Sequence, residues 1–253
     1  MYDLSGKRIW VAGHRGLTLT PSGRELLEDV RRMGDAAQRV SVSAGGRSEA
    51  IDGTIRITAS EVYAFVLLPP IIRKLREVHP GIQVQVVAST GPTDLLRREA
   101  DIAIRNFVST QPDLIARKIR DDHAHLYATP DYLRSIGNPK TLQDLEKADF
   151  LGFYDTDMMV KGLNGLGLNL TERNFTVTCN SHLVQWSLVK AGVGVGGITE
   201  NVGEHEPLVR RALPDMPPMV VPMWLVAHRE LHTGKRVRTV FDFLASHLTG
   251  EGE

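Results

Sequence analysis

From residue 53 onward, short strand-like segments alternate regularly with segments of helical periodicity. Residues 53–59 alternate apolar and polar side chains, which indicates a half-buried strand. Residues 69–79 carry apolar side chains three or four positions apart, which indicates an amphipathic helix. The remaining strands are expected at 82–87, 101–105, 125–128, 150–153, 175–179, 193–198 and 223–228, and the remaining helices at 93–99, 131–135, 141–147, 182–191 and 237–248. This alternation predicts an α/β fold with mainly parallel sheets covered on both faces.

Composition narrows the class of protein. The 253 residues correspond to one large or two small domains. Lys+Arg and Asp+Glu number 30 each, and a net charge of zero argues against strong sequence-independent binding to a polyanion. No apolar run approaches the roughly 18–20 residues of a membrane span, and no signal peptide is visible. Cys179 is the one cysteine, so we expect a soluble cytoplasmic protein without an internal disulfide framework or a membrane partner.

A long helix is expected ahead of the α/β region. Thr20 can cap its N-terminus, Pro21 suits its first position, and Gly45-Gly46 marks its end. Its apolar side chains form one stripe: Leu26, Leu27, Val30, Met33, Ala37 and Val40. Such a stripe needs a partner surface. Docking on the chain's own body and pairing with a second copy are both compatible with the pattern.

Several segments, in their order and spacing, resemble the LysR-type transcriptional regulators over about residues 16–248. They are RGLTLTPSG (15–23), GTIRITAS (53–60), LLPPIIRKLREVHPGIQVQV (67–86), DIAIR (101–105), LYATPDYLRSIGNPKTLQDL (126–145), VKAGVGVGGI (189–198) and HTGKRVRTVFDFL (232–244). The resemblance implies a winged helix-turn-helix, a dimerising linker helix and an effector-binding domain. That domain consists of two Rossmann-like α/β subdomains joined by crossing strands, similar to periplasmic solute-binding proteins.

The resemblance also implies a domain layout for this chain. Residues 17–46 are expected to hold the end of the wing and the linker helix, and residues 53–248 the effector-binding domain. Within it, subdomain I is expected at about 53–124 and 229–248, and subdomain II at about 125–228. We expect a homodimer or homotetramer.

Residues 1–16 follow a different pattern. A strand around Trp10 precedes Gly13 and Gly16 in a G-x-x-G turn, which resembles the N-terminus of GDP-L-fucose synthases, relatives of the short-chain dehydrogenases. The third glycine and the helix start of a dinucleotide site are absent. The Tyr-x-x-x-Lys pair is absent too, because the residues four positions after the five tyrosines are Gly6, Leu67, Asp131, Ile136 and Met158. We therefore expect no dehydrogenase activity and no cofactor.

This stretch stands where the family carries its recognition helix. Sequence is read by a helix in the major groove, and sixteen residues with one short strand cannot supply that helix and its scaffold. We therefore expect effector sensing without specific DNA binding, which would require the intact family architecture. The alternative is a stand-alone cytoplasmic small-molecule-binding protein. Solute capture for transport would require an export signal.

Candidate effector-binding residues follow strand ends and precede helices, where free backbone N–H groups can hold a carboxylate. They are Ser60, Glu61, Ser89, Thr90, Arg105, Asn180, Ser181 and His182. Arg105 is the residue that can pair bidentately with an anion, whereas Glu61 would disfavour one unless it points away. The resemblance implies a small-molecule effector, in this family often a carboxylate. Capping and structural ion pairs are the competing interpretations of the same residues.

Other residues give weaker signals. His123 and His125 are two positions apart, but the sequence offers no further ligands to complete a metal site with them. Asp121 and Asp122 suggest a solvated turn. Cys179 is expected to be a buried thiol. Met158 and Met159 stand in a Gly-rich segment that suggests a mobile loop. The aromatic residues Phe107, Phe153 and Tyr154 can either wall a pocket or belong to the core.

Overall fold

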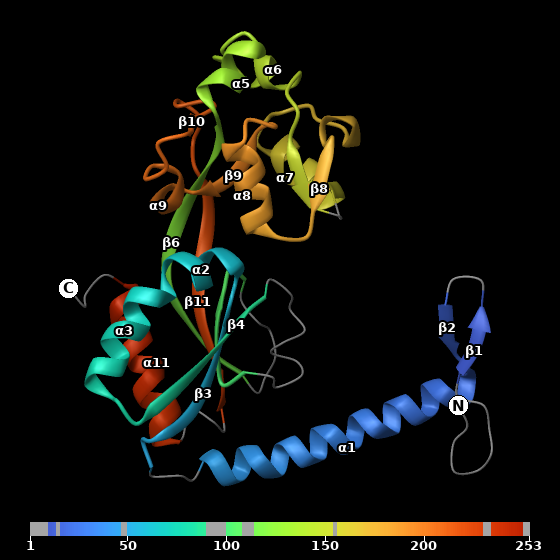
Figure 1. Cartoon of the computed structure of the whole chain (residues 1–253), viewed down its shortest axis with the longest axis vertical. Helices are drawn as coiled ribbons and strands as arrows, with labels where there is room; N and C mark the ends of the chain where they lie inside the picture. The colour runs from blue at the N-terminus through green and yellow to red at the C-terminus, as the bar shows by residue number, and fades with distance from the viewer. Residues whose placement is uncertain are drawn as a thin grey trace.

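The computed structural model describes residues 10–13, 16–46, 50–89, 100–107, 114–153, 156–229 and 234–249. Figure 1 shows two α/β lobes joined by two long strands, with a helix and a hairpin extending away from the first lobe. The helix expected at 93–99 lies outside the described residues.

Lobe I is built on a parallel sheet of strands that the alternating pattern predicts. Its three strands are β3 (Gly53–Ala59), β4 (Ile82–Ala88) and β5 (Ile102–Arg105). Strand β3 lies in the middle and pairs with both β4 and β5. Its helices are α2 (Glu61–Val66), α3 (Leu68–Val78) and α11 (Lys235–Leu248). One face of the sheet and these helices share a buried apolar core that includes Ile55, Ile57, Leu75, Ile104, Val240 and Leu244.

The connection between the lobes consists of β6 (Leu114–Ala128) and β11 (Met219–His228). They pair antiparallel along the whole length of β11, and β11 also pairs antiparallel with β5. The expectation of mainly parallel sheets is therefore wrong here, because one strand leaves lobe I and the other returns to it. The subdomain boundary expected at 228/229 is also too late, since Met223, Leu225 and Ala227 already pack in the core of lobe I.

Lobe II forms around the second half of β6. There β9 (Gly196–Thr199) and β10 (Arg210–Arg211) pair with β6, while β7 (Leu151–Phe153) and β8 (Val177–Cys179) form a parallel pair. Its helices are α5 (Pro130–Ser135), α6 (Leu142–Leu145), α7 (Thr156–Gly165), α8 (His182–Lys190), α9 (Glu200–Gly203) and a short 3-10 turn at Glu172–Asn174. Its core contains Leu126, Leu133, Leu145, Phe150, Phe175 and Val195.

Two local expectations are wrong. The Gly-rich segment expected as a mobile loop is the helix α7, in which Met159, Val160 and Leu163 pack against the core of lobe II. Burial of this apolar side outweighs the cost of a helical glycine, roughly 1 kcal/mol. Asp121 and Asp122 lie within β6 and not in a turn.

The N-terminal part contains a hairpin and a long helix. Strands β1 (Trp10–Gly13) and β2 (Gly16–Leu19) pair antiparallel, so the G-x-x-G segment connects two strands and leads to no helix. Helix α1 (Pro21–Gly46) has the expected bounds, and Thr20 Oγ1 accepts a hydrogen bond from the backbone N–H of Gly23 at 3.0 Å.

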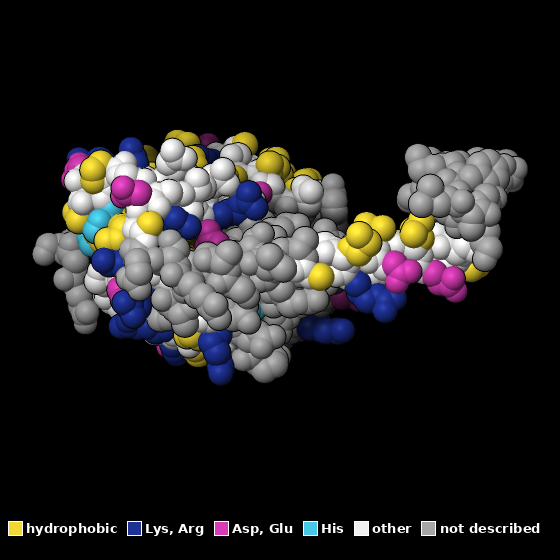
Figure 2. All heavy atoms as spheres, turned by 90° about the horizontal axis from the view of Figure 1, so that it is seen from below, with side chains coloured by type: hydrophobic (Ala, Val, Ile, Leu, Met, Phe, Trp, Pro, Cys, Tyr) yellow, Lys and Arg dark blue, Asp and Glu magenta, His cyan; other side chains and the backbone are white. Residues whose placement is uncertain are grey.

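Three side chains of the apolar stripe of α1 are exposed in this chain. Val30 is 56% and Met33 72% exposed, and Leu26 is exposed as well. Figure 2 shows apolar side chains along one edge of the projecting helix and charged ones along the other. Docking of these residues on the chain's own body is therefore the wrong interpretation. No helix in the described part of the chain is long and apolar enough to cross a membrane.

A close backbone approach in lobe II gives a stability prediction. A Cβ on Gly203 would lie 2.2 Å from Cζ of Tyr127, whose ring is fully buried and packs against Trp186. We expect Gly203→Ala to lower the free energy of unfolding by roughly 1–3 kcal/mol in urea titrations. A Cβ on Gly162, within α7, would meet no atom within 4 Å. Because alanine favours a helix over glycine, Gly162→Ala should stabilise the protein by about 0.5–1 kcal/mol. Equal effects of the two substitutions would contradict the packing described here.

Candidate functional site

A cavity of about 250 Å³, which we call the interlobe cavity, lies where the two lobes and the crossing strands meet. Lobe I contributes Ser60, Val62, Tyr63 and Asn106; lobe II contributes Phe153, Met159, His182, Gln185, Gly197, Ile198 and Thr199; the crossing strands contribute Ala124, Met219 and Val221. A second, apolar space of about 200 Å³ in lobe II shares Met159, Gly197 and Met219 with it.

The lobe I wall is organised around Tyr63. Its hydroxyl donates to Oδ2 of Asp122 at 2.8 Å and accepts a hydrogen bond from Nδ2 of Asn106 at 2.7 Å. Arg120 Nε donates to the other carboxylate oxygen of Asp122 at 2.7 Å. Burial, helped by the neighbouring Asp122 carboxylate, raises the pKa of Tyr63 far above its usual value. The phenol is therefore uncharged, and the wall presents neutral polar groups.

The lobe II wall is organised around the start of α8. The ring of His182 meets the ring of Phe153 edge-on, with 4.3 Å between centroids. Burial lowers the pKa of His182, against the opposing effect of the Glu61 carboxylate, so the imidazole is neutral near neutral pH. The amide nitrogen of Gln185 is already engaged, because it donates to the carbonyl oxygen of Leu151 at 2.5 Å.

Glu61 joins the two lobes at the edge of this cavity. Its Oε2 accepts hydrogen bonds from Oγ of Ser181 at 2.8 Å and from the backbone N–H of His182 at 2.7 Å. These donors stand at the N-terminus of α8, where the helix dipole favours negative charge. We call this arrangement the cross-lobe contact.

Two hydroxyl-bearing residues of the cavity are nearly buried. Thr199 is 8% exposed, and its Oγ1 has no hydrogen-bond partner among the described residues. Ser60 is 9% exposed and precedes α2 without making a side-chain capping hydrogen bond. Buried polar atoms in native proteins almost always have a partner. Because the Thr199 oxygen has almost no accessible surface, it lies behind the surface of the cavity wall.

The structure brings together only part of the set expected from the sequence. Ser60 and His182 line the interlobe cavity, and Glu61 and Ser181 form the cross-lobe contact. Asn180 is exposed and outside the lining. Thr90 lies outside the described residues. The same holds for Tyr154, one of the three aromatic residues considered as walls of a pocket. Of the other two aromatic candidates, Phe153 lines the cavity and Phe107 does not.

Arg105 and Ser89 also stand apart from the cavity. Arg105 is 2% exposed, and its guanidinium donates to Thr58 Oγ1 at 2.9 Å and to the carbonyl oxygen of Ile104. The next residue, Asn106, follows the end of β5 and lines the cavity instead. Ser89 uses its backbone N–H to bond the carbonyl oxygen of Ala59 at 2.8 Å.

Sequence reasoning missed several lining residues, namely Tyr63, Asn106, Met159, Gln185 and Thr199. Gln185 follows His182 by one helical turn, a spacing that places both on one side of α8. Thr199 ends β9, so the rule that ligands bind at strand ends could have found it. Met159 required the knowledge that its segment is helical.

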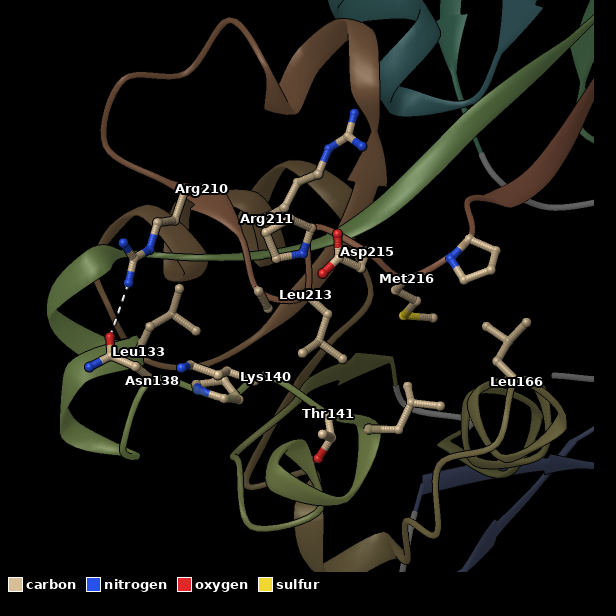
Figure 3. Close-up of a pocket in the computed structure, with 15 residues that line it drawn as sticks. Leu133, Asn138, Lys140, Thr141, Leu166, Arg210, Arg211, Leu213, Asp215 and Met216 are labelled. Atoms are coloured by element: carbon tan, nitrogen blue, oxygen red, sulfur yellow. Dashed lines mark hydrogen bonds between the residues drawn. The ribbon is translucent and has the colours of Figure 1, made fainter.

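A larger pocket of about 680 Å³ lies within lobe II alone and is drawn in Figure 3. Its walls include Leu133, Leu142, Leu213 and Met216, and Arg210 Nη2 donates to Oδ1 of Asn138 at 3.1 Å across one end. No residue of lobe I among those described lines this pocket, so a molecule bound there would contact lobe II in the described part of the chain.

The residues considered for a metal are used in other contacts. His123 and His125 both approach the carboxylate of Glu200, at 3.5 and 3.7 Å. Within the described ranges there is no group of three His, Cys, Asp or Glu side chains able to hold a metal ion. The Cys179 thiol is half-buried and donates to the carbonyl oxygen of Ser181 at 3.2 Å.

Curated relatives resemble nearly the whole chain. The regulator CrgA of Neisseria meningitidis serogroup C is 23% identical over 242 residues, which is 92% of this chain and 80% of CrgA. The activator TtdR of Escherichia coli K12 is 26% identical over 92% of this chain and 76% of its own length. BbuR of Bordetella bronchiseptica is 28% identical over 96% of this chain and 77% of its own length.

Solved structures show the same fold. The regulatory domain of CrgA, a LysR-type regulator, matches with a TM-score of 0.68 and 24% identity over 78% of this chain and 99% of that domain. Full-length AphB of Vibrio cholerae matches with a TM-score of 0.69 and 21% identity over 94% of this chain and 83% of AphB. The two-lobed, periplasmic-binding-protein-like architecture is therefore confirmed.

The sequence profile described as the LysR substrate binding domain matches residues 48–249, which include both lobes and the crossing strands. The chain thus belongs to the LysR family of transcriptional regulators, and this part of it is the substrate-binding domain.

Proposed function

We propose that this LysR-type regulator binds a small-molecule effector in the interlobe cavity and works as a cytoplasmic homo-oligomer that assembles through α1. The observation that carries the first part is a cavity walled by both lobes and by the strands between them. A molecule in that position contacts groups that move relative to one another when the lobes rearrange. The relatives named as transcriptional regulators support a sensing role and a non-enzymatic protein.

The mechanism is a shift between arrangements of the lobes. An effector favours one arrangement only to the extent that it contacts that arrangement better than the other. Here both walls contribute side chains to one cavity, Tyr63 from lobe I and Thr199 from lobe II, so one molecule can contact both lobes. The cross-lobe contact of Glu61 stabilises the arrangement of the lobes seen here. An effector that favours another arrangement must compensate for the loss of these hydrogen bonds.

Cavity blocking tests this site. A side chain on Gly197 would meet Met219 Cε at 3.8 Å, ordinary contact distance, and a branched residue suits its strand. In thermal scans against single-ring acids, amides and alcohols, an effector at about 100 times its dissociation constant should add roughly 2.7 kcal/mol of stability. We expect Gly197→Val to abolish the resulting shift of the unfolding midpoint and Arg210→Ala, in the larger pocket of lobe II, to keep it. The reverse pattern would place the effector in that larger pocket.

The exposed stripe of α1 generates the assembly prediction. Val30 and Met33 are apolar side chains in water along a helix that extends from the body, and this favours the regulator over a stand-alone binding protein. Val30→Glu together with Met33→Glu should shift the protein toward monomer in sedimentation velocity runs. Glu28→Lys, on the opposite side of the helix, serves as the control and should leave the sedimentation coefficient unchanged. An unchanged oligomer in the double variant would rule out this stripe as the interface.

The proposal includes weak, unselective DNA binding by these 253 residues on their own. Ahead of α1 the described residues form a short hairpin of two four-residue strands, and the recognition helix that helix-turn-helix proteins place in the major groove is not among the described residues. We expect a labelled promoter fragment and a scrambled fragment of equal length to bind equally at the same salt concentration. Selective nanomolar binding to the promoter would contradict this part of the proposal.

A further inference from the structure

The N-terminus of α8 already holds an anion that belongs to the chain itself. Ser181 Oγ and the backbone N–H of His182 both donate to the Glu61 carboxylate, which comes from the opposite lobe. In a two-lobed binding domain, a helix N-terminus beside the cavity is the natural site for a ligand carboxylate. In this chain that site is filled.

The remaining described lining of the interlobe cavity carries no charge. It includes no Lys, Arg, Asp or Glu among the described residues, and the phenol of Tyr63 and the imidazole of His182 are both neutral. Arg105 is hydrogen-bonded to Thr58 on the other side of the strand. A carboxylate entering the cavity would lose its hydration, gain no described cation and face the negative charge of Glu61.

The cavity nevertheless suits a small uncharged molecule. Its volume is about 250 Å³. An apolar protein cavity of about 150 Å³ is already large enough to bind benzene. Val62, Phe153 and Ile198 provide apolar walls.

We propose that the effector is an uncharged molecule about the size of one substituted ring, and that Glu61 excludes carboxylates by occupying the anion site at α8. This inference rests on the proposed function, because it assumes that the interlobe cavity is the effector site.

Three probes of one shape test the inference on the full chain: benzyl alcohol, benzamide and benzoate, titrated by calorimetry. For the unsubstituted protein we expect the better of the two uncharged probes to bind at least about tenfold more tightly than benzoate. Glu61→Gln keeps an acceptor for Ser181 and His182 but removes the charge, so it should improve benzoate binding while changing benzamide binding little.

The control variant is Glu172→Gln, which removes one negative charge from an exposed turn of lobe II and should change no affinity. If benzoate binds the unsubstituted protein best and Gly197→Val abolishes that binding, the inference is wrong and the proposed site stands. If Glu61→Gln leaves benzoate binding unchanged, the role of Glu61 is wrong. If no probe binds, or if Gly197→Val changes no affinity, the interlobe cavity is not the effector site and both proposals fail.

Discussion

The antiparallel pairing of β6 and β11 is the constraint on which the rest of the structure depends. These strands place Leu225 in the core of lobe I and Leu126 in the core of lobe II, so both lobes are built on the same two segments. Because the strands also provide Ala124 and Met219 as the floor of the interlobe cavity, a change in their path changes the cavity. A molecule bound in the cavity would therefore contact the two segments on which both lobes are built.

The polar groups around the cavity are arranged so that nearly all are used within the protein. Tyr63 is held by Asp122 and Asn106, Gln185 bonds a backbone carbonyl, and Glu61 bonds the start of α8. Paired groups of this kind hold the walls in place and offer little to a ligand. The hydroxyl of Thr199 lacks a described partner, but its oxygen has almost no accessible surface. Recognition is therefore expected to depend mainly on shape.

Element positions were predictable where local pattern and burial agree. The strand at 53–59 and the helix α1 have the bounds that their periodicity and caps predict. The prediction failed for α7, whose Gly162 and Gly165 suggest a loop although the packing of Leu163 stabilises a helix. It also failed for Arg105, because the end of a strand was predicted correctly but not the face to which its side chain points.

The sequence by itself determined the alternation of strands and helices, the apolar stripe of α1 and membership in the LysR family, because these depend on local periodicity and on the order of segments along the chain. Only the tertiary structure decided that Glu61 meets Ser181, 120 positions further along the chain, and that Asn106 rather than Arg105 lines the cavity. Contacts across the lobes depend on how β6 and β11 bring distant segments together, and no local pattern encodes that geometry.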